Sequence, residues 1–242
     1  MENKKISTKK SDLEAKGIVL CGLCQDMMKK IPNEGVNLTV TSPPYDNIRD
    51  YKGYCFEEED FKKIVSELYR VTKKGGVVVW VVGDAVKNGS ETGTSFRQAL
   101  GFMEGGFKLH DTMIYEKNTS SFPARRTGKR YTQIFEYMFV FSKGKISTGN
   151  LICDKPNKWA GHTNWGKNTH RGKNGELVKT KDIKPVPDFS PRNNIWRYNV
   201  GNKFNSSDKE SHNHPAIFPE KLAEDHILSW SNEGDVVLDP FM

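Results

Sequence analysis

The residues with the clearest chemical potential form a run of five at the end of an apolar segment, Thr41-Ser42-Pro43-Pro44-Tyr45. Two consecutive prolines fix φ and stiffen the backbone. A stiff loop can aim a backbone carbonyl and a side-chain oxygen at one amino group, and the tyrosine adds a face on which a planar ring can stack. Taken alone, such a turn is more typical of a purely structural role.

The segments before and after this run predict the elements that must position it. Val36–Thr41 is apolar and β-branched, which predicts a buried strand ending in the loop. Residues 57–72 have helical periodicity, with an acidic first turn and a basic last turn. Gly75-Gly76 allows the chain to leave that helix with φ > 0, and the apolar run 77–82 predicts a strand covered on both faces.

The pattern continues with a helix predicted at 95–103, strands at 108–116 and 135–142, and a last apolar strand that begins at Asp235. Alternating strands and helices indicate an α/β doubly wound sheet. Such sheets bind ligands outside the carboxyl ends of their strands. The loops after Thr41 and after Val82 lie at such ends.

The positive charge is concentrated in one segment. The chain has 37 Lys and Arg against 30 Asp and Glu, a net charge of +7. Residues 143–210 hold 14 basic and 6 acidic residues, a charge of +8, so the rest of the chain is close to neutral. This segment is rich in Asn, Lys, Gly, Pro and Trp and shows little periodicity. We expect it to meet a polyanion; the alternative is a basic loop region that is merely soluble.

Composition narrows the class of protein. With 36% hydrophobic and 28% charged residues, the 242-residue chain fits a globular protein. It has no run of membrane-spanning length and no export signal, and its four cysteines are too few for a disulfide framework. These features predict a cytoplasmic protein with no membrane partner and a flexible tail at 1–16. Cys21-Gly22-Leu23-Cys24 has no second pair, so no metal site is expected.

The S-P-P-Y run resembles the catalytic motif of DNA amino-methyltransferases, which methylate the exocyclic nitrogen of cytosine or adenine. Four other segments resemble motifs of the same enzymes: R-V-T-K-K-G-G at 70–76, V-G-D at 82–84, H-P-A-I-F-P at 214–219 and V-L-D-P-F at 237–241. Thr72 and Lys74 replace the usual Leu and Pro. Phe218 stands where adenine enzymes often have Lys.

The order of these motifs is similar to that of the permuted β-type enzymes. The resemblance implies a Rossmann-like α/β methyltransferase sheet, with a catalytic half at 17–142, a target-recognition insert at 143–210 and the start of a cofactor-binding half at 211–242. It also implies that the glycines of the cofactor loop and two strands would follow Met242. Besides double-stranded DNA, we therefore expect a carboxyl-terminal complementing fragment as a partner, and an exposed apolar edge at 236–238.

The resemblance also assigns residues to roles. The catalytic residues are Ser42, Pro43, Pro44 and Tyr45. The residues expected to bind S-adenosylmethionine are Thr41, His214, Pro215, Phe218, Asp239, Pro240 and Phe241. Within the insert, side chains that can read bases or neutralise phosphates are Lys158, Asn164, Lys167, Arg171, Lys173, Arg192 and Arg197. Trp159 and Trp165 are expected to pack the insert onto the body.

The expected activity is methyl transfer from S-adenosylmethionine to an amino nitrogen of a flipped DNA base, in a bacterial or phage restriction-modification setting. Ser rather than Asp at position 42 favours cytosine-N4 over adenine-N6. One alternative is a non-catalytic DNA-binding fragment of a split or truncated enzyme. Another is a methyltransferase that acts on RNA or on a protein side-chain amide.

Overall fold

The computed structural model describes residues 17–44, 56–118, 129–163, 169–179, 184–201, 205 and 217–241. Its helices are α1 (Cys24–Met28), α2 (Glu58–Val71), α3 (Thr94–Glu104) and α4 (Glu220–Trp230). The strands of the main sheet are β1 (Val36–Thr41), β2 (Thr72–Val82), β5 (Lys108–Lys117), β6 (Phe135–Ser142), β11 (Ile195–Tyr198) and β12 (Val237–Leu238). The strands outside it are β3 (Val86–Lys87), β4 (Ser90–Glu91), β7 (Lys155–Pro156), β8 (Thr169–Arg171), β9 (Leu177–Lys179) and β10 (Phe189–Ser190).

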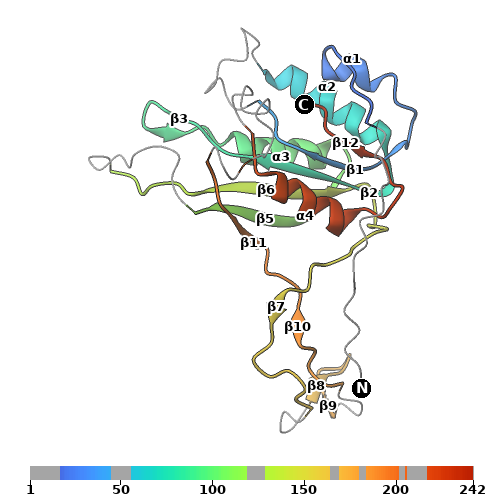
Figure 1. Ribbon diagram of the computed structural model, residues 1–242, viewed down its shortest axis with the longest axis vertical. Coiled ribbons are helices and arrows are strands. Elements are labelled where there is room, and N and C mark those ends of the chain that lie inside the picture. Colours follow the sequence, from blue (N-terminus) through green and yellow to red (C-terminus); the bar gives the residue numbers. More distant parts are fainter. Residues whose placement is uncertain are drawn as a thin grey trace.

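The body is built on one six-stranded sheet with the order β11-β5-β6-β2-β1-β12 (Figure 1). Strand β1 is parallel to both β12 and β2, and β11 is parallel to β5. Only β6 among these six runs in the opposite direction, antiparallel to β2 and to β5. The predicted α/β sheet is confirmed, and it is mixed rather than wholly parallel.

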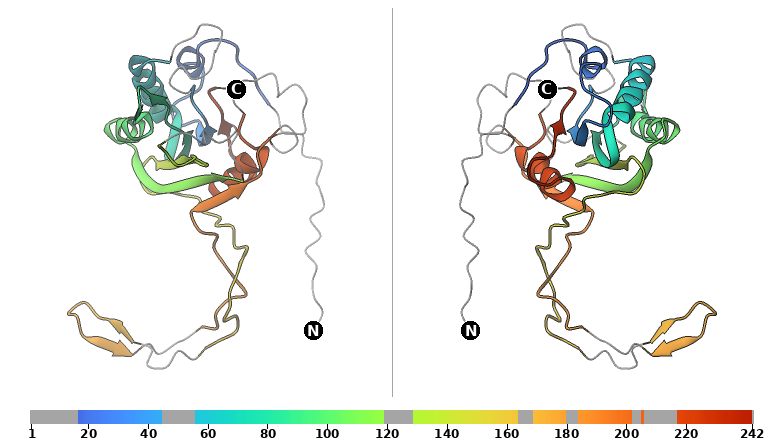
Figure 2. Two further views of the ribbon diagram at one scale, coloured as in Figure 1. Left: turned by 90° about the vertical axis from the view of Figure 1, so that its left-hand side faces the viewer. Right: turned by 90° about the vertical axis from the view of Figure 1, so that its right-hand side faces the viewer.

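Helices cover both faces of the sheet (Figure 2). On one face, α1, α2 and α3 pack over a cluster that contains Trp80 and Phe102, and the Trp80 indole donates a hydrogen bond to Gln98 at 2.8 Å. On the other face, α4 packs over a cluster that contains Leu38 and Met138. Side chains of β2 alternate between the two clusters, which explains why residues 77–82 are all apolar.

Strand β2 begins five residues earlier than the sequence predicts because the glycine turn lies inside it. The register with β1 shifts between Thr72 and Val77, and Gly75 within this shift has φ +80°. A Cβ atom at Gly75 would lie 2.9 Å from the Ser147 Cβ and 3.0 Å from the Lys145 carbonyl oxygen. The predicted positive φ at this turn is therefore confirmed, and it comes with close packing.

We expect Gly75→Ala to lower the free energy of unfolding by about 2–4 kcal/mol, because left-handed strain adds to crowding. Gly89 is a matched control: its φ is +79°, and no atom lies within 4 Å of a Cβ built on it. Gly89→Ala should therefore cost only the strain, about 1–2 kcal/mol. Urea unfolding of both variants measures the difference, and equal losses would show that crowding at Gly75 is unimportant.

A long arm projects from the body (Figures 1 and 2). We define the arm as residues 153–193. Two antiparallel pairs build it, β7 with β10 and, at its end, β8 with β9. Segments on either side of the arm belong to the body, because Ile146 and Ile152 pack against the core and β11 joins the main sheet. The projecting part is therefore shorter than the predicted insert.

Trp159 does not pack the arm onto the body. Its side chain is 51% exposed and lies near His162 and Lys158, within the arm. The tryptophan that does so is Trp196 of β11, which is 6% exposed and belongs to the core on the α4 side. The prediction for Trp159 was wrong because composition alone does not distinguish which aromatic side chain reaches the core. Trp165 lies outside the described residues.

Candidate active site

Several sequence motifs meet at one edge of the sheet. Strands β1, β2 and β12 are parallel and end at this edge, and the antiparallel β6 begins there. The edge therefore carries residues 41–44 after β1, 83–84 after β2, 239–241 after β12, and 135–137 at the start of β6. We call these residues the site edge. Their convergence agrees with the rule that open α/β sheets bind ligands beyond the carboxyl ends of their strands.

A hydrogen bond joins the two central motifs. Thr41 Oγ1 donates to Asp239 Oδ1 at 2.6 Å, and the backbone N–H of Phe241 donates to the same oxygen at 3.0 Å. Thr41 is fully buried at the end of β1, two residues after Thr39, which pairs with Leu238 of β12. This half-buried bond ties the D-P-F loop to the strand that carries the S-P-P turn.

The S-P-P turn continues directly from a core strand. Thr41 is still paired with Trp80 of β2, Pro43 is buried, and Ser42 and Pro44 are half-buried. The proline rings fix φ at positions 43 and 44 and restrict the backbone before each ring, so the Pro43 carbonyl keeps a nearly constant direction at the edge. Tyr45, the fourth predicted catalytic residue, lies outside the described residues.

The predicted cofactor residues divide between the two faces of the sheet. The Phe241 ring lies edge-on to Trp80 and Phe56, with centroids 5.8 Å and 5.9 Å away, on the α2 side. Phe218 packs against the core on the α4 side. The structure thus brings Thr41, Asp239 and Phe241 together but places Phe218 across the sheet. His214 and Pro215 lie outside the described residues.

Two charged side chains to which the sequence assigned no role, Asp84 of the V-G-D motif and Glu136, flank the same edge. Asp84 accepts hydrogen bonds from the Ser95 backbone N–H at 3.0 Å and from the Ser95 hydroxyl, which fixes the loop after β2 to the start of α3. Glu136 forms an ion pair with Lys117 at 2.5 Å, and its Cγ would lie 3.3 Å from a Cβ built on Gly83. No local pattern marks this ion pair, because its members are on neighbouring antiparallel strands, 19 residues apart.

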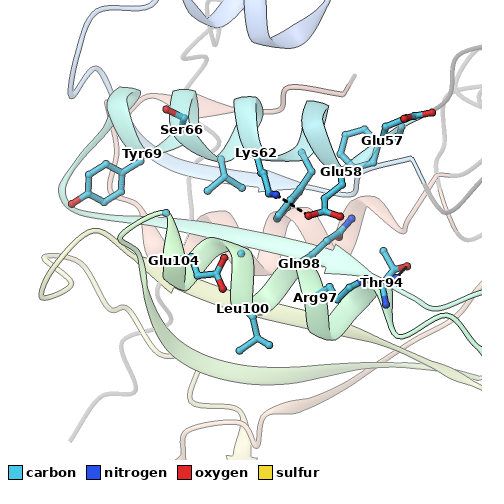
Figure 3. A pocket seen from close by; sticks show the side chains of 15 residues that line it. Glu57, Glu58, Lys62, Ser66, Tyr69, Thr94, Arg97, Gln98, Leu100 and Glu104 are labelled. Carbon is cyan, nitrogen blue, oxygen red and sulfur yellow. Dashed lines mark hydrogen bonds and ion pairs between the residues drawn. The ribbon is translucent and has the colours of Figure 1, made fainter.

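A cavity of about 590 Å³ lies between α2 and α3 (Figure 3), and none of residues 41–44 lines it. It exists where glycines bring the helices together: a Cβ atom on Gly101 would lie 2.5 Å from the Phe61 ring. The Glu58–Lys62 ion pair at 2.8 Å lines one side. At one end it reaches Phe56, which contacts Phe241. The cavity therefore adjoins the D-P-F loop, and the S-P-P turn does not line it.

The residues predicted to bind DNA fall into two groups. Lys158, Arg171 and Lys173 are exposed in the arm. Arg192, at the base of the arm, forms ion pairs with Asp154 and Asp225, and Arg197 of β11 forms one with Glu116. Asn164 and Lys167 lie outside the described residues. The arm thus presents exposed basic side chains along its length and an ion-paired one at its base.

Comparison with known proteins identifies the family. The sequence model of the DNA methylase family matches residues 36–242. The orphan methyltransferase M.BamHII of Bacillus amyloliquefaciens is 57% identical over 216 residues, which cover 89% of this chain and 79% of that protein. The Type II methyltransferase M.BglII of Bacillus subtilis is 26% identical, over 91% of this chain and 58% of that protein.

Solved structures agree on the fold. The PvuII DNA methyltransferase, which is cytosine-N4-specific, has a TM-score of 0.60 at 18% identity, over 90% of this chain and 71% of that chain. The complex of M1.HpyAVI with S-adenosylmethionine has a TM-score of 0.51 at 19% identity, over 91% of this chain and 80% of that chain.

The chain therefore belongs to the DNA methylase family, and it is a DNA methyltransferase of the N4/N6 amino-methyltransferase class. This confirms the resemblance that the motifs indicated and favours an enzyme over a non-catalytic fragment. In the described parts of the chain, no helix has both the length and the apolar character needed to cross a membrane.

Proposed function

We propose that the protein transfers a methyl group from S-adenosylmethionine to the N4 amino group of cytosine in duplex DNA. The observation that carries the proposal is the Thr41–Asp239 hydrogen bond, which joins the S-P-P turn and the D-P-F loop at one edge. The preference for cytosine over adenine comes from Ser42, by resemblance to cytosine-N4 enzymes. The Type II names of relatives support a restriction-modification setting. A complementing fragment beyond Met242 stays a prediction.

The residues at the site edge fit the cofactor by the chemistry of their side chains. Asp239 brings a carboxylate, Thr41 a hydroxyl and Phe241 an aromatic ring, and Phe56 adds a second ring in contact with Phe241. A carboxylate suits the positive charges of S-adenosylmethionine, and the rings suit its adenine. Thr41, Asp239 and Phe241 would hold the molecule, which supplies an electrophilic methyl group on a sulfonium centre when bound.

The S-P-P turn acts on the amino group of the base. The lone pair of an exocyclic nitrogen is delocalised into the ring, which makes it a poor nucleophile. The Ser42 hydroxyl and the Pro43 carbonyl can each accept one of its N–H groups and so favour a pyramidal nitrogen with an available lone pair. Catalysis then comes from positioning and fixed dipoles rather than from a covalent intermediate on the protein.

The target base must leave the duplex to reach the turn. Flipping costs a few kcal/mol, and the ring of Tyr45 next to Pro44 can stack on the base and offset about 1–3 kcal/mol of that cost. This step explains why a stacking residue follows directly after the two prolines.

The end of the arm supplies a surface that can read the DNA sequence. In the β8–β9 hairpin, Thr169 pairs with Lys179 and Arg171 with Leu177, so these four side chains share one face. His170 and Val178 occupy the other face, and all six residues are exposed. A two-stranded ribbon fits the major groove, where Arg can bind guanine and an apolar side chain can contact the thymine methyl.

We expect Arg171→Ala to lower kcat/KM on the recognition sequence by an amount equivalent to about 1–3 kcal/mol and to relax selectivity at one base position. His170→Ala, on the opposite face of the hairpin, is the control and should leave selectivity unchanged. Methylation rates on the recognition sequence and its single-base variants measure both effects. Unchanged selectivity in Arg171→Ala would assign base reading to another part of the chain.

Analysis of the product tests the reaction itself. DNA methylated by the enzyme is digested to nucleosides and analysed by mass spectrometry, and we expect N4-methylcytosine. N6-methyladenine alone would reverse the assignment of the base while leaving the reaction class intact. Methylation of RNA or of protein amides, with none on duplex DNA, would contradict the proposed substrate.

A further inference from the structure

The arm meets the body at an ionic junction centred on Arg192. Its Nη1 donates to Asp225 Oδ2 of α4 at 2.8 Å, and its Nε donates to Asp154 Oδ2 at 2.9 Å. Asp154 lies on the outgoing side of the arm and Arg192 on the returning side. One guanidinium therefore ties both sides of the arm together and ties the pair to α4.

The acceptor on α4 is a buried carboxylate. Asp225 is 2% exposed and accepts hydrogen bonds from Arg192, from the Tyr198 hydroxyl at 2.8 Å and from Lys221 at 2.9 Å. Burial raises the pKa of this carboxyl, but these donors together hold it below its ordinary value. Asp225 thus joins the arm, the edge strand β11 and α4 as an ionised group.

Packing restricts the Arg192 side chain further. Its guanidinium lies over the buried Trp196 ring, 5.1 Å from the centroid, and its backbone N–H donates to the Ile152 carbonyl at 2.9 Å. The side chain as a whole is only 26% exposed. A planar guanidinium can serve two carboxylates and a ring at once, which an ammonium group cannot.

We propose that Arg192 is a positioning residue that fixes the direction of the arm relative to the site edge. The arm is long, so a small rotation at its base displaces the β8–β9 hairpin by a large amount. Tyr198, at the carboxyl end of β11, extends the junction to the same edge of the sheet that carries the S-P-P turn. The inference rests on the proposed role of the arm in reading DNA, and it replaces the predicted DNA contact by Arg192.

The test uses Arg192→Met in the full chain, because Tyr198 and Lys221 still satisfy Asp225 in this variant and the fold should persist. Arg192→Met removes the charge-assisted hydrogen bonds that fix the direction of the arm. Because the arm is then less well placed to bind DNA, KM for the recognition DNA should rise about 10-fold. The kcat value at saturating DNA should stay within about two-fold, because the site edge is untouched. Amide hydrogen exchange should accelerate at 150–157 and 186–194 but not in β1 or β2.

Lys221→Met is the matched control, because it removes a charged donor from the same carboxylate without touching the arm. It should leave KM for DNA and exchange in the arm at wild-type values, and Arg192→Lys should restore only part of the KM effect. A lower melting temperature in Arg192→Met, with unchanged KM and exchange, would make the junction purely structural and overturn the proposal.

Arg171→Ala at the hairpin separates this inference from the proposed function. If that variant recognises DNA normally, the hairpin is not the reader, and the proposed role of the arm fails. Faster exchange at the base of the arm in Arg192→Met would still support the ionic junction. If Arg171→Ala loses selectivity while Arg192→Met behaves as wild type, the arm is the reader and the positioning role of Arg192 is wrong.

Discussion

Replacing Ser42 with alanine lowers kcat for methyl transfer by about 100-fold or more, and it leaves the affinity for DNA almost unchanged. Ser42 is half-buried at the end of a core strand. In the proposed mechanism its hydroxyl accepts a hydrogen bond from the amino group, and this bond strengthens as the nitrogen becomes pyramidal. Removing one fixed hydrogen-bonding group that acts mainly in the transition state typically costs about 100–1,000-fold in rate. Because we propose that the arm, and not Ser42, holds the DNA, the affinity for DNA should not fall with the rate.

Single-turnover methylation with labelled S-adenosylmethionine and a direct DNA-binding assay measure the two quantities separately. Tyr45→Phe is the conservative control and should stay active, since it keeps the stacking ring. Tyr45→Ala removes the ring and should lower the rate with Ser42→Ala. Near-wild-type turnover in both alanine variants would contradict the assignment of the catalytic turn.

Local sequence patterns predict the elements of this fold closely. The strands 36–41 and 135–142 match β1 and β6, and the predicted helices begin within one residue of α2 and α3. The apolar pattern of each helix or strand records which of its side chains pack into the core, so it can be recognised from that segment alone. In β2, for example, adjacent residues face two different cores, so every one of 77–82 must be apolar.

Long-range pairing could not be predicted in the same way. Residues 195–198 pair with β5, about 80 positions earlier in the chain, and no local periodicity marks this strand as part of the main sheet. The short strands of the arm have no buried face to impose a pattern. In a segment without a buried face or a regular spacing of apolar residues, the sequence predicts the net charge but not the strands.

The same distinction applies to the active site. The S-P-P and D-P-F motifs are visible in sequence because each is contiguous, but the hydrogen bond between Thr41 and Asp239 joins positions 198 residues apart. Arg192 shows the limit of reading charge alone. Its ion pairs with Asp154 and Asp225 hold it between the arm and α4, whereas the exposed Arg171 in the hairpin has the freedom that a DNA contact needs.

A buried histidine should make the fold sensitive to mild acid. His226 of α4 is 0% exposed, and burial lowers its pKa to about 3, against a weaker opposing effect of Asp225. The contacts of the ring suit the neutral form. Trp230 Nε1 donates to His226 Nδ1 at 3.3 Å, and His226 Nε2 lies 3.2 Å from the Met138 sulfur. Protonation of Nδ1 would break the first contact and place a charge in the core.

The direction of the pH effect follows from the two states. In the unfolded chain the pKa returns to about 6.5, so between pH 6.5 and 3 the unfolded state binds more protons than the folded state. The free energy of unfolding therefore falls as the pH drops through this window. A single group of this kind predicts a loss of about 2 kcal/mol between pH 7 and pH 5.

Urea unfolding at pH 7, 6 and 5 tests this, with His226→Gln as the decisive variant. A glutamine side chain does not titrate, so this variant should start less stable than wild type but lose about 2 kcal/mol less of its stability between pH 7 and pH 5. Asp225 should contribute little to the change in stability between pH 7 and pH 5. The pKa of its carboxyl is lowered, so its protonation affects the free energy of unfolding only below about pH 4. Equal slopes in wild type and His226→Gln would show that the buried ring is not the source of the acid sensitivity.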